Sequence, residues 1–167
     1  MRLSRALLIA AAVAVADQLT KLWVVAARPF GSESEVIPGL FRIVHTRNRG
    51  VAFGLFGASG GAVQLILLAA VAGIVAFVAW QLSRTGEGGP AAWGLALVLG
   101  GAIGNIVDRV FRGEVVDFLD FYLRFGGREH HWFAFNVADS AITVGACLVV
   151  LGELVSQAGS KRAPGTD

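Results

Sequence analysis

Four long apolar stretches divide this chain, and their length restricts its possible folds more than any other feature. They cover residues 3–27, 62–82, 90–111 and 135–155. A helix of about 20 largely apolar residues spans the hydrocarbon core of a bilayer. Only 16% of the 167 residues are charged, whereas soluble domains carry about 25%. We therefore expect a mainly α-helical membrane protein, with four transmembrane helices in a single domain covering residues 1–167.

The first apolar stretch also resembles a cleavable secretory signal. Arg2 and Arg5 precede an apolar run that ends in the small residues 14–16, as in a signal peptide with its cleavage site. Apolar residues resume after Lys21, however, and make the whole stretch long enough to span a bilayer. We favour a retained helix, which keeps Asp17 and Lys21 in the protein.

Two polar segments, at residues 28–60 and 112–134, separate the apolar stretches and are expected outside the membrane. Within them, β-branched and aromatic residues at 40–45 and 115–125 favour short strands or an interfacial element. Asp117 and Asp120 are three positions apart in the second of these. On a strand they would point to opposite faces, one towards the helices and the other towards water. The residues themselves do not say which.

The third apolar stretch contains polar groups that lipid would not tolerate without partners. Charged side chains in a transmembrane helix are costly, and they mark candidate functional sites. Asn105, Asp108 and Arg109 stand at i, i+3 and i+4, on one helical face. A glycine-rich run at residues 100–104, which includes Gly101, permits close approach of another helix. For Asp108 and Arg109 we favour ion pairs that join helices.

The fourth and first stretches carry polar groups of two kinds. Asn136 and Asp139 stand at i and i+3, and no basic residue lies within four positions of Asp139. If Asp139 has no charged partner, its carboxyl group beside lipid tends to stay protonated. Alternatively, Asp139 pairs with a basic residue from another helix, such as Arg109 or Lys21. Asp17 and Lys21, at i and i+4, are expected to neutralise each other.

Several other chemistries fit these residues less well. Ser140 has no histidine placed for a serine-type triad. His130 and His131 are adjacent and diverge on any regular element, so neither a metal site nor a cofactor is expected. The net charge of +2 is too small and dispersed to indicate nucleic acid. The single cysteine, Cys147, is expected to be a small buried apolar side chain.

Five short blocks follow one another along nearly the whole chain. They are DQLTK at 17–21, NRGVAFG at 48–54, GGAIGNIVDR at 100–109, VDF at 116–118 and FNVADS at 135–140. Each block alone is short. In this order and at these spacings, they closely resemble the lipoprotein signal peptidases of bacteria, the signal peptidase II family.

The resemblance implies a fold, a location and an activity. It implies four transmembrane helices in the bacterial plasma (inner) membrane, a small extracytoplasmic β-sheet cradle, and both termini in the cytoplasm. Charge counts do not favour this orientation, since five basic residues would lie inside and seven outside. The implied activity is that of an aspartyl endopeptidase, which cuts a prolipoprotein before its diacylglyceryl-modified cysteine.

The resemblance also assigns residues and partners. Asp117 and Asp139 become the catalytic dyad, near the extracytoplasmic face. The residues expected to hold the dyad or contact substrate are Asn105, Asp108, Arg109, Asn136, Asn48, Gly50, Gly101, Asp17 and Lys21. The expected partners are diacylglyceryl prolipoproteins, membrane lipid and globomycin-type inhibitors, and the expected state is a monomer. Which aspartate is ionised stays open.

Two other functions stay in view on the residues alone. A small transporter or channel could use Asp17, Asp108 and Asp139 as an ion path. A membrane enzyme acting on lipid headgroups could use paired aspartates to bind a divalent metal. Flux through liposomes would favour the first alternative, and sensitivity to chelators would favour the second.

Overall fold

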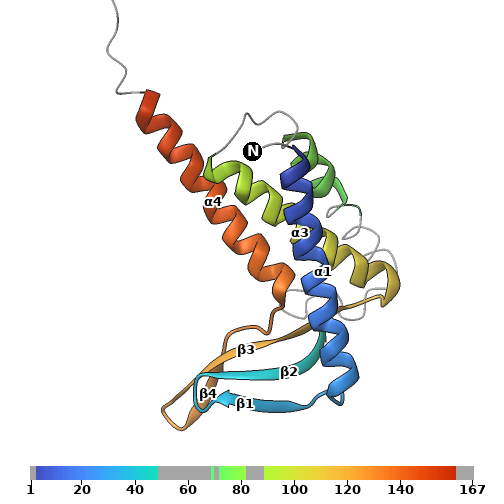
Figure 1. Cartoon of the computed structure of the whole chain (residues 1–167). Coiled ribbons are helices and arrows are strands. Elements are labelled where there is room, and N and C mark those ends of the chain that lie inside the picture. Colours follow the sequence, from blue (N-terminus) through green and yellow to red (C-terminus); the bar gives the residue numbers. More distant parts are fainter. Residues whose placement is uncertain (1–2, 49–68, 70–71, 82–88, 161–167) are drawn as a thin grey trace, which may run out of the picture.

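The computed structural model describes residues 3–48, 69, 72–81 and 89–160, and these residues form a helical layer with a small sheet at one end (Figure 1). The long helices are α1 (Leu3–Ala27), α3 (Pro90–Phe111) and α4 (Val137–Ser160). A shorter apolar helix covers Ala72–Gln81. The rest of the span expected at 62–82 lies outside the described residues, except for residue 69.

Each long helix is apolar enough and long enough to cross a membrane. Helices α1 and α3 have the bounds expected from their apolar stretches. Helix α4 begins at Val137, two residues later than the expected start of its stretch. Phe135 instead pairs with Leu119 of the sheet, and the side chain of Asn136 caps the helix, so neither residue can belong to it.

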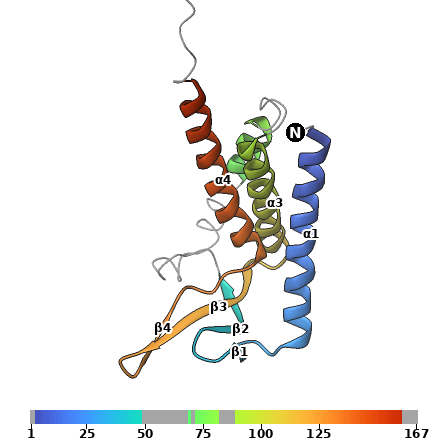
Figure 2. The same cartoon turned by 60° about the vertical axis from the view of Figure 1, so that its left-hand side comes forward.

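Helix α3 lies between α1 and α4, and glycines bring their backbones close (Figure 2). A Cβ atom at Gly100 would come within 2.6 Å of the Ala10 carbonyl oxygen of α1. A Cβ atom at Gly101 would overlap the Ala138 carbonyl oxygen of α4. Only glycine permits this spacing, so the close helix approach predicted for residues 100–104 is present.

The sheet is antiparallel, with its four strands in the order β1-β2-β3-β4. The strands are β1 (Glu33–Ile37), β2 (Phe41–Asn48), β3 (Val115–Phe125) and β4 (Arg128–His131). Strands β2 and β3 confirm the two strand predictions. Gly126 and Gly127 join β3 to β4 with φ angles of +61° and +74°, which suit a two-residue hairpin turn.

The direction of the helices places the sheet at one end of the layer. Helix α1 runs towards the sheet and α4 runs away from it (Figures 1 and 2). The first turn of α1 and the last turn of α4 therefore lie at the same end, away from the sheet. The segments that join the helices to β1, β3 and β4 all lie at the opposite end.

Cys147 of α4 corrects one expectation. It was expected to be buried, but its side chain is exposed, like that of Val144 on the same helix. The outer surface of a helix in a bilayer meets hydrocarbon instead of water. An apolar side chain on such a helix therefore need not be buried in the protein interior.

Candidate active site

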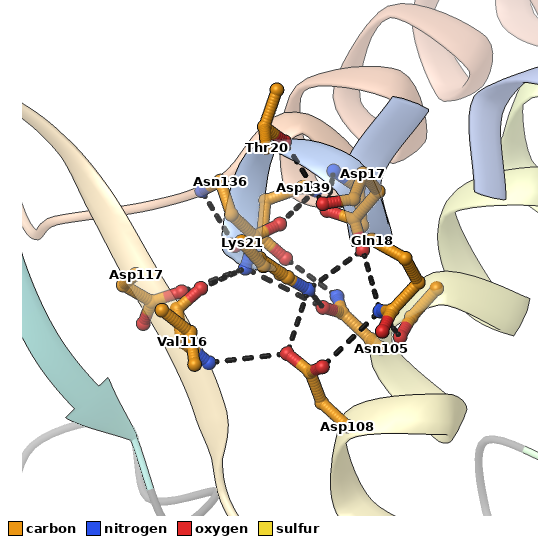
Figure 3. A network of polar contacts seen from close by, with 12 residues as sticks. Asp17, Gln18, Thr20, Lys21, Asn105, Asp108, Val116, Asp117, Asn136 and Asp139 are labelled. Atoms are coloured by element: carbon orange, nitrogen blue, oxygen red, sulfur yellow. Dashed lines mark hydrogen bonds and ion pairs between the residues drawn. The ribbon is translucent and has the colours of Figure 1, made fainter. Parts of the chain in front are cut away.

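Polar side chains gather where the three long helices meet strand β3 (Figure 3). Helix α1 supplies Asp17, Gln18 and Lys21, α3 supplies Asn105 and Asp108, β3 supplies Asp117, and α4 with its cap supplies Asn136 and Asp139. Most of these side chains are buried. Their hydrogen bonds therefore decide whether their charges are tolerated.

Lys21 forms ion pairs with two carboxylates at once. Its Nζ atom lies 2.8 Å from Asp17 Oδ2 and 2.9 Å from Asp108 Oδ2, and it donates to Asn105 Oδ1 at 3.1 Å. These three contacts use all three donors of the ammonium group, and the side chain is fully buried. The predicted pair of Asp17 and Lys21 is present, and Asp108 joins it from another helix.

Asp108 has further partners that the sequence analysis did not single out. Its carboxylate accepts from Arg112, from Gln18 Nε2 at 3.1 Å and from the Val116 backbone N–H at 3.1 Å. Arg112 lies four residues after Asp108, so the i, i+4 spacing was an available signal. Gln18 gave no such signal, because its contact crosses from α1 to α3.

Asp139 and Asn136 cap the first turn of α4 reciprocally. Asn136 Oδ1 accepts from the Asp139 N–H at 3.0 Å, and Asp139 Oδ2 accepts from the Asn136 N–H at 3.3 Å. This arrangement is a capping box. Asp17 Oδ1 satisfies a further N–H group, that of Ala138, at 2.9 Å. The Asp139 carboxylate is thus fixed by the start of its own helix.

Asp117 is buried beside these groups, and its environment favours the protonated form. Burial, and then the charge of Asp139, raise the pKa of Asp117 to about 7, from 3.8. Hydrogen bonds from the side chains of Asn136 and Asn48 oppose this rise in pKa, as does the charge of Lys21. Asp117 therefore changes its protonation state near neutral pH.

Asparagine side chains connect the two aspartates. Asn136 donates to Asp117 Oδ1 at 2.7 Å while it caps the helix that carries Asp139. Asn105 donates to Asp139 Oδ1 at 2.8 Å. The charge of Arg109 acts on both carboxylates. Two nearby carboxyl groups that share a proton can supply a general acid and a general base together.

Asp120 lies away from this pair and is not exposed to water. Arg42 Nε donates to its Oδ2 at 2.6 Å, and His131 Nδ1 lies 3.1 Å from the same oxygen. The expectation that one of the two strand aspartates meets water is therefore wrong, because Asp120 is only 5% exposed. The neighbouring strands β2 and β4 cover it.

A cavity of about 280 Å³ opens beside Asp139. Its lining combines the apolar residues Trp132, Phe135 and Val144 with Asp139, Ser140 and Thr143. It can hold an apolar chain next to a carboxylate.

The structure brings most of the expected residues together around the carboxylate pair. Gly101 lies apart from them, at the contact between α3 and α4, and Gly50 falls outside the described residues. In the described part of the chain, no group of three or more His, Cys, Asp or Glu residues is placed to hold a metal ion.

The fold and the site together define a membrane protein with a pair of neighbouring carboxyl groups, Asp117 buried and Asp139 partly buried. Comparison with known proteins gives its family. The sequence model described as signal peptidase (SPase) II matches residues 9–155. The chain belongs to the signal peptidase II family, and it is therefore a peptidase rather than a transporter or a headgroup enzyme.

Relatives and solved structures agree with this assignment. The chain is similar to the lipoprotein signal peptidase of Solibacter usitatus, with 43% identity over 148 residues, covering 86% of each chain. It is 45% identical over 147 residues to that of Oleidesulfovibrio alaskensis, covering 86% of this chain and 90% of that one. A solved bacterial membrane enzyme superposes with a TM-score of 0.79 at 29% identity, over 98% of this chain and 95% of that one.

Proposed function

We propose that Asp117 and Asp139 are the catalytic pair with which this chain removes signal peptides from prolipoproteins, cutting before the diacylglyceryl-modified cysteine. The observation that carries the proposal is the connection through Asn136, which bonds Asp117 directly and caps the helix of Asp139. Burial, and then the charge of Asp139, raise the pKa of Asp117 to about 7. A pair that exchanges a proton near neutral pH is suited to peptide hydrolysis.

The reaction follows from one proton shared between two carboxyl groups. The ionised aspartate takes a proton from a water molecule, whose oxygen attacks the scissile carbonyl carbon. The protonated aspartate donates to the developing oxyanion. Collapse of the tetrahedral intermediate breaks the C–N bond, and a proton passes to the leaving amine. The pair ends with one proton, as it began, and no acyl-enzyme forms.

The surrounding contacts give the pair its geometry. Lys21 donates to Asn105 Oδ1, which leaves the Asn105 amide nitrogen to face Asp139. Lys21 itself is fixed by Asp17 and Asp108. The buried ammonium group therefore positions the catalytic pair through an amide, and it takes no proton from the substrate. Asn48, which bonds Asp117, is a candidate for contact with the substrate.

The proposed arrangement in the membrane has four spans, with a span at 62–82 completing the layer. The first turn of α1 and the last turn of α4 share one end of that layer (Figure 2), which supports placing both termini in the cytoplasm. The sheet and the carboxylate pair would then lie at the extracytoplasmic face. A lipid-modified substrate could reach the cavity beside Asp139 from within the bilayer.

The test uses the purified full chain in detergent with a diacylglyceryl-modified prolipoprotein. We expect a product that begins at the modified cysteine, identified by mass spectrometry, and no such product in the presence of globomycin. The same precursor without its lipid is the matched control. Full cleavage in the presence of a chelator is also expected. Cleavage elsewhere, or none, would contradict the proposal.

A further inference from the structure

A second cavity, of about 320 Å³, has no part in the mechanism above. It opens on the sheet, between β2, β3 and the segment that leads from β4 to α4. Its walls include Arg42 and Thr46 of β2, Asp120 of β3, and His131, Trp132 and Phe133. It is therefore more polar than the cavity beside Asp139.

Asp120, which lines this cavity, has one carboxylate oxygen without a hydrogen-bond partner among the described residues. Asp120 Oδ2 accepts from Arg42 and contacts His131. Asp120 Oδ1 is buried, and no donor bonds it within the part of the chain that the structure describes. Buried polar atoms are almost always hydrogen-bonded, since leaving one unsatisfied is costly. A donor on a bound molecule would complete this carboxylate.

The charge of the cavity decides which donor it accepts. Among the described residues, Glu33 and Asp120 line it together with the guanidinium of Arg42. That guanidinium already contacts Glu33 at 2.5 Å and Asp120 at 2.6 Å, and it stacks over the Tyr122 ring at 4.8 Å. The cavity thus favours a hydroxyl, amide or ammonium group and disfavours an anion.

Trp132 connects the two cavities. The residue lines both the sheet cavity and the cavity beside Asp139, and it is 73% exposed. An extended chain that passes Asp139 can therefore continue past Trp132 into the sheet cavity. The apolar part of such a chain fits the Asp139 side, and its polar part fits the Asp120 side.

We propose that the cavity at Asp120 binds the first residues of the mature polypeptide that follow the modified cysteine. A hydrogen-bond donor among them would bond Asp120 Oδ1, and an acidic residue would be disfavoured. The mature polypeptide is the polar part of a prolipoprotein, whereas its signal peptide and lipid are apolar. This inference rests on the proposed function, because it assigns the part of the substrate that each cavity receives.

The experiment compares lipid-modified prolipopeptides that differ only at the two positions after the modified cysteine. These positions carry lysine, serine, alanine or aspartate. With the full chain in detergent, we expect the KM for the aspartate peptide to exceed that for the lysine peptide about tenfold, as suits a hydrogen bond to a charged group. The kcat values should differ much less. Equal KM values would overturn the inference.

Two variants locate the effect. Asp120→Asn removes the charge at constant size, and it should reduce the tenfold spread in KM to about twofold or less. Glu129→Gln removes a charge from the same cluster, since Glu129 lies 3.5 Å from Arg42, but Glu129 is not among the residues that line the cavity. It should leave the spread unchanged. An equal reduction by both variants would indicate a general field effect and overturn the inference.

Folding and function can be separated within the same experiment. Thermal unfolding in detergent shows whether Asp120→Asn is folded, and the peptide comparison on the unaltered chain decides the question if it is not. If no lipid-modified peptide is cut, the proposed function fails. If all are cut with the same KM, only the assignment of the sheet cavity fails.

Discussion

Two groups of carboxylates lie near each other in this molecule, and they are held by different partners. Asp17 and Asp108 are bonded directly by the ammonium group of Lys21. Asp117 and Asp139 receive hydrogen bonds from the amide side chains of Asn136 and Asn105. Both groups are assembled from separate elements, with α1 and α3 in the first case and β3 and α4 in the second.

The comparison separates structural charge from reactive charge. A carboxylate bonded directly to a buried ammonium has its charge offset by that cation, and the ion pair joins the two elements that carry it. Asp117 is bonded by the Asn136 amide and lies near a second carboxylate. Its pKa is raised to about 7, so its protonation can change near neutral pH. Under the proposed function, the same residue type joins helices in one place and moves protons in the other.

Removing either aspartate of the amide-held pair should have the largest effect. We expect Asp117→Asn and Asp139→Asn each to lower kcat for prolipoprotein cleavage by about 10³-fold or more, because one proton carrier is lost. Both variants should remain folded, as measured by thermal unfolding in detergent. Glu153→Gln, an exposed carboxylate on the same helix as Asp139, is the matched control. Near-normal turnover in either aspartate variant would end the dyad proposal.

Breaking the ammonium-held group should reduce stability. Lys21→Met leaves two buried carboxylates without their shared cation, and we expect it to destabilise the fold by about 3–5 kcal/mol. Unfolding in detergent with increasing denaturant measures the loss. Adding Asp108→Asn to Lys21→Met removes one of the stranded charges, so the double variant should recover part of the stability. A Lys21→Met variant as stable as the original chain would contradict the comparison.

The pH dependence of stability tests the amide-held pair in another way. The pKa of Asp117 is about 7 in the folded state and 3.8 ordinarily. Between pH 3.8 and pH 7, Asp117 is therefore protonated in the folded state and ionised in the unfolded state. The contribution of Asp117 to the free energy of unfolding is therefore fully present below pH 3.8, and it is lost as the pH rises through 7. Asp117→Asn should remove that loss.

The measurement compares the unaltered chain with Asp117→Asn in detergent at pH 4, 6 and 8. The two should be about equally stable at pH 4, and the variant should be the more stable at pH 8, by up to about 4 kcal/mol. Parallel stability curves across this range would show that burial does not raise the pKa of Asp117.

A smaller effect is expected where the packing supports the pair from a distance. Gly101→Ala would push its Cβ atom into Ala138 O and to 2.9 Å from Ile142 Cγ1. We expect a loss of about 1–3 kcal/mol in stability, and reduced turnover because the start of α4 carries Asp139. Gly73→Ala, where a Cβ meets nothing within 4 Å, should be neutral or slightly stabilising. Equal effects in both variants would exclude the packing explanation.

Much of the helical layer could be predicted, because apolar length is a local property. The bounds of α1 and α3 follow from their stretches. The start of α4 could not be read from hydropathy, since apolar Phe135 pairs with the sheet. The spacing of Asn136 and Asp139 indicated a shared face, and it also fits the capping box that the sequence analysis did not consider.

The site was predicted less completely, because its partners come from distant parts of the chain. Helical spacing placed Asn105 and Asp108 on one face, yet it could not show that Lys21 joins them. Strand periodicity separated Asp117 from Asp120 without saying which faces the helices. That choice depends on how β3 meets Asn136, which is a tertiary contact.

The order in which the chain is made gives the Asp17–Lys21 pair a further importance. Helix α1 is synthesised first, long before α3 supplies Asp108 and α4 supplies the Ala138 N–H for Asp17. Because Asp17 and Lys21 neutralise each other within one helix turn, α1 can enter the bilayer without net charge in its interior. Asp108 of α3 and the Ala138 N–H of α4 then meet a preformed polar patch on α1.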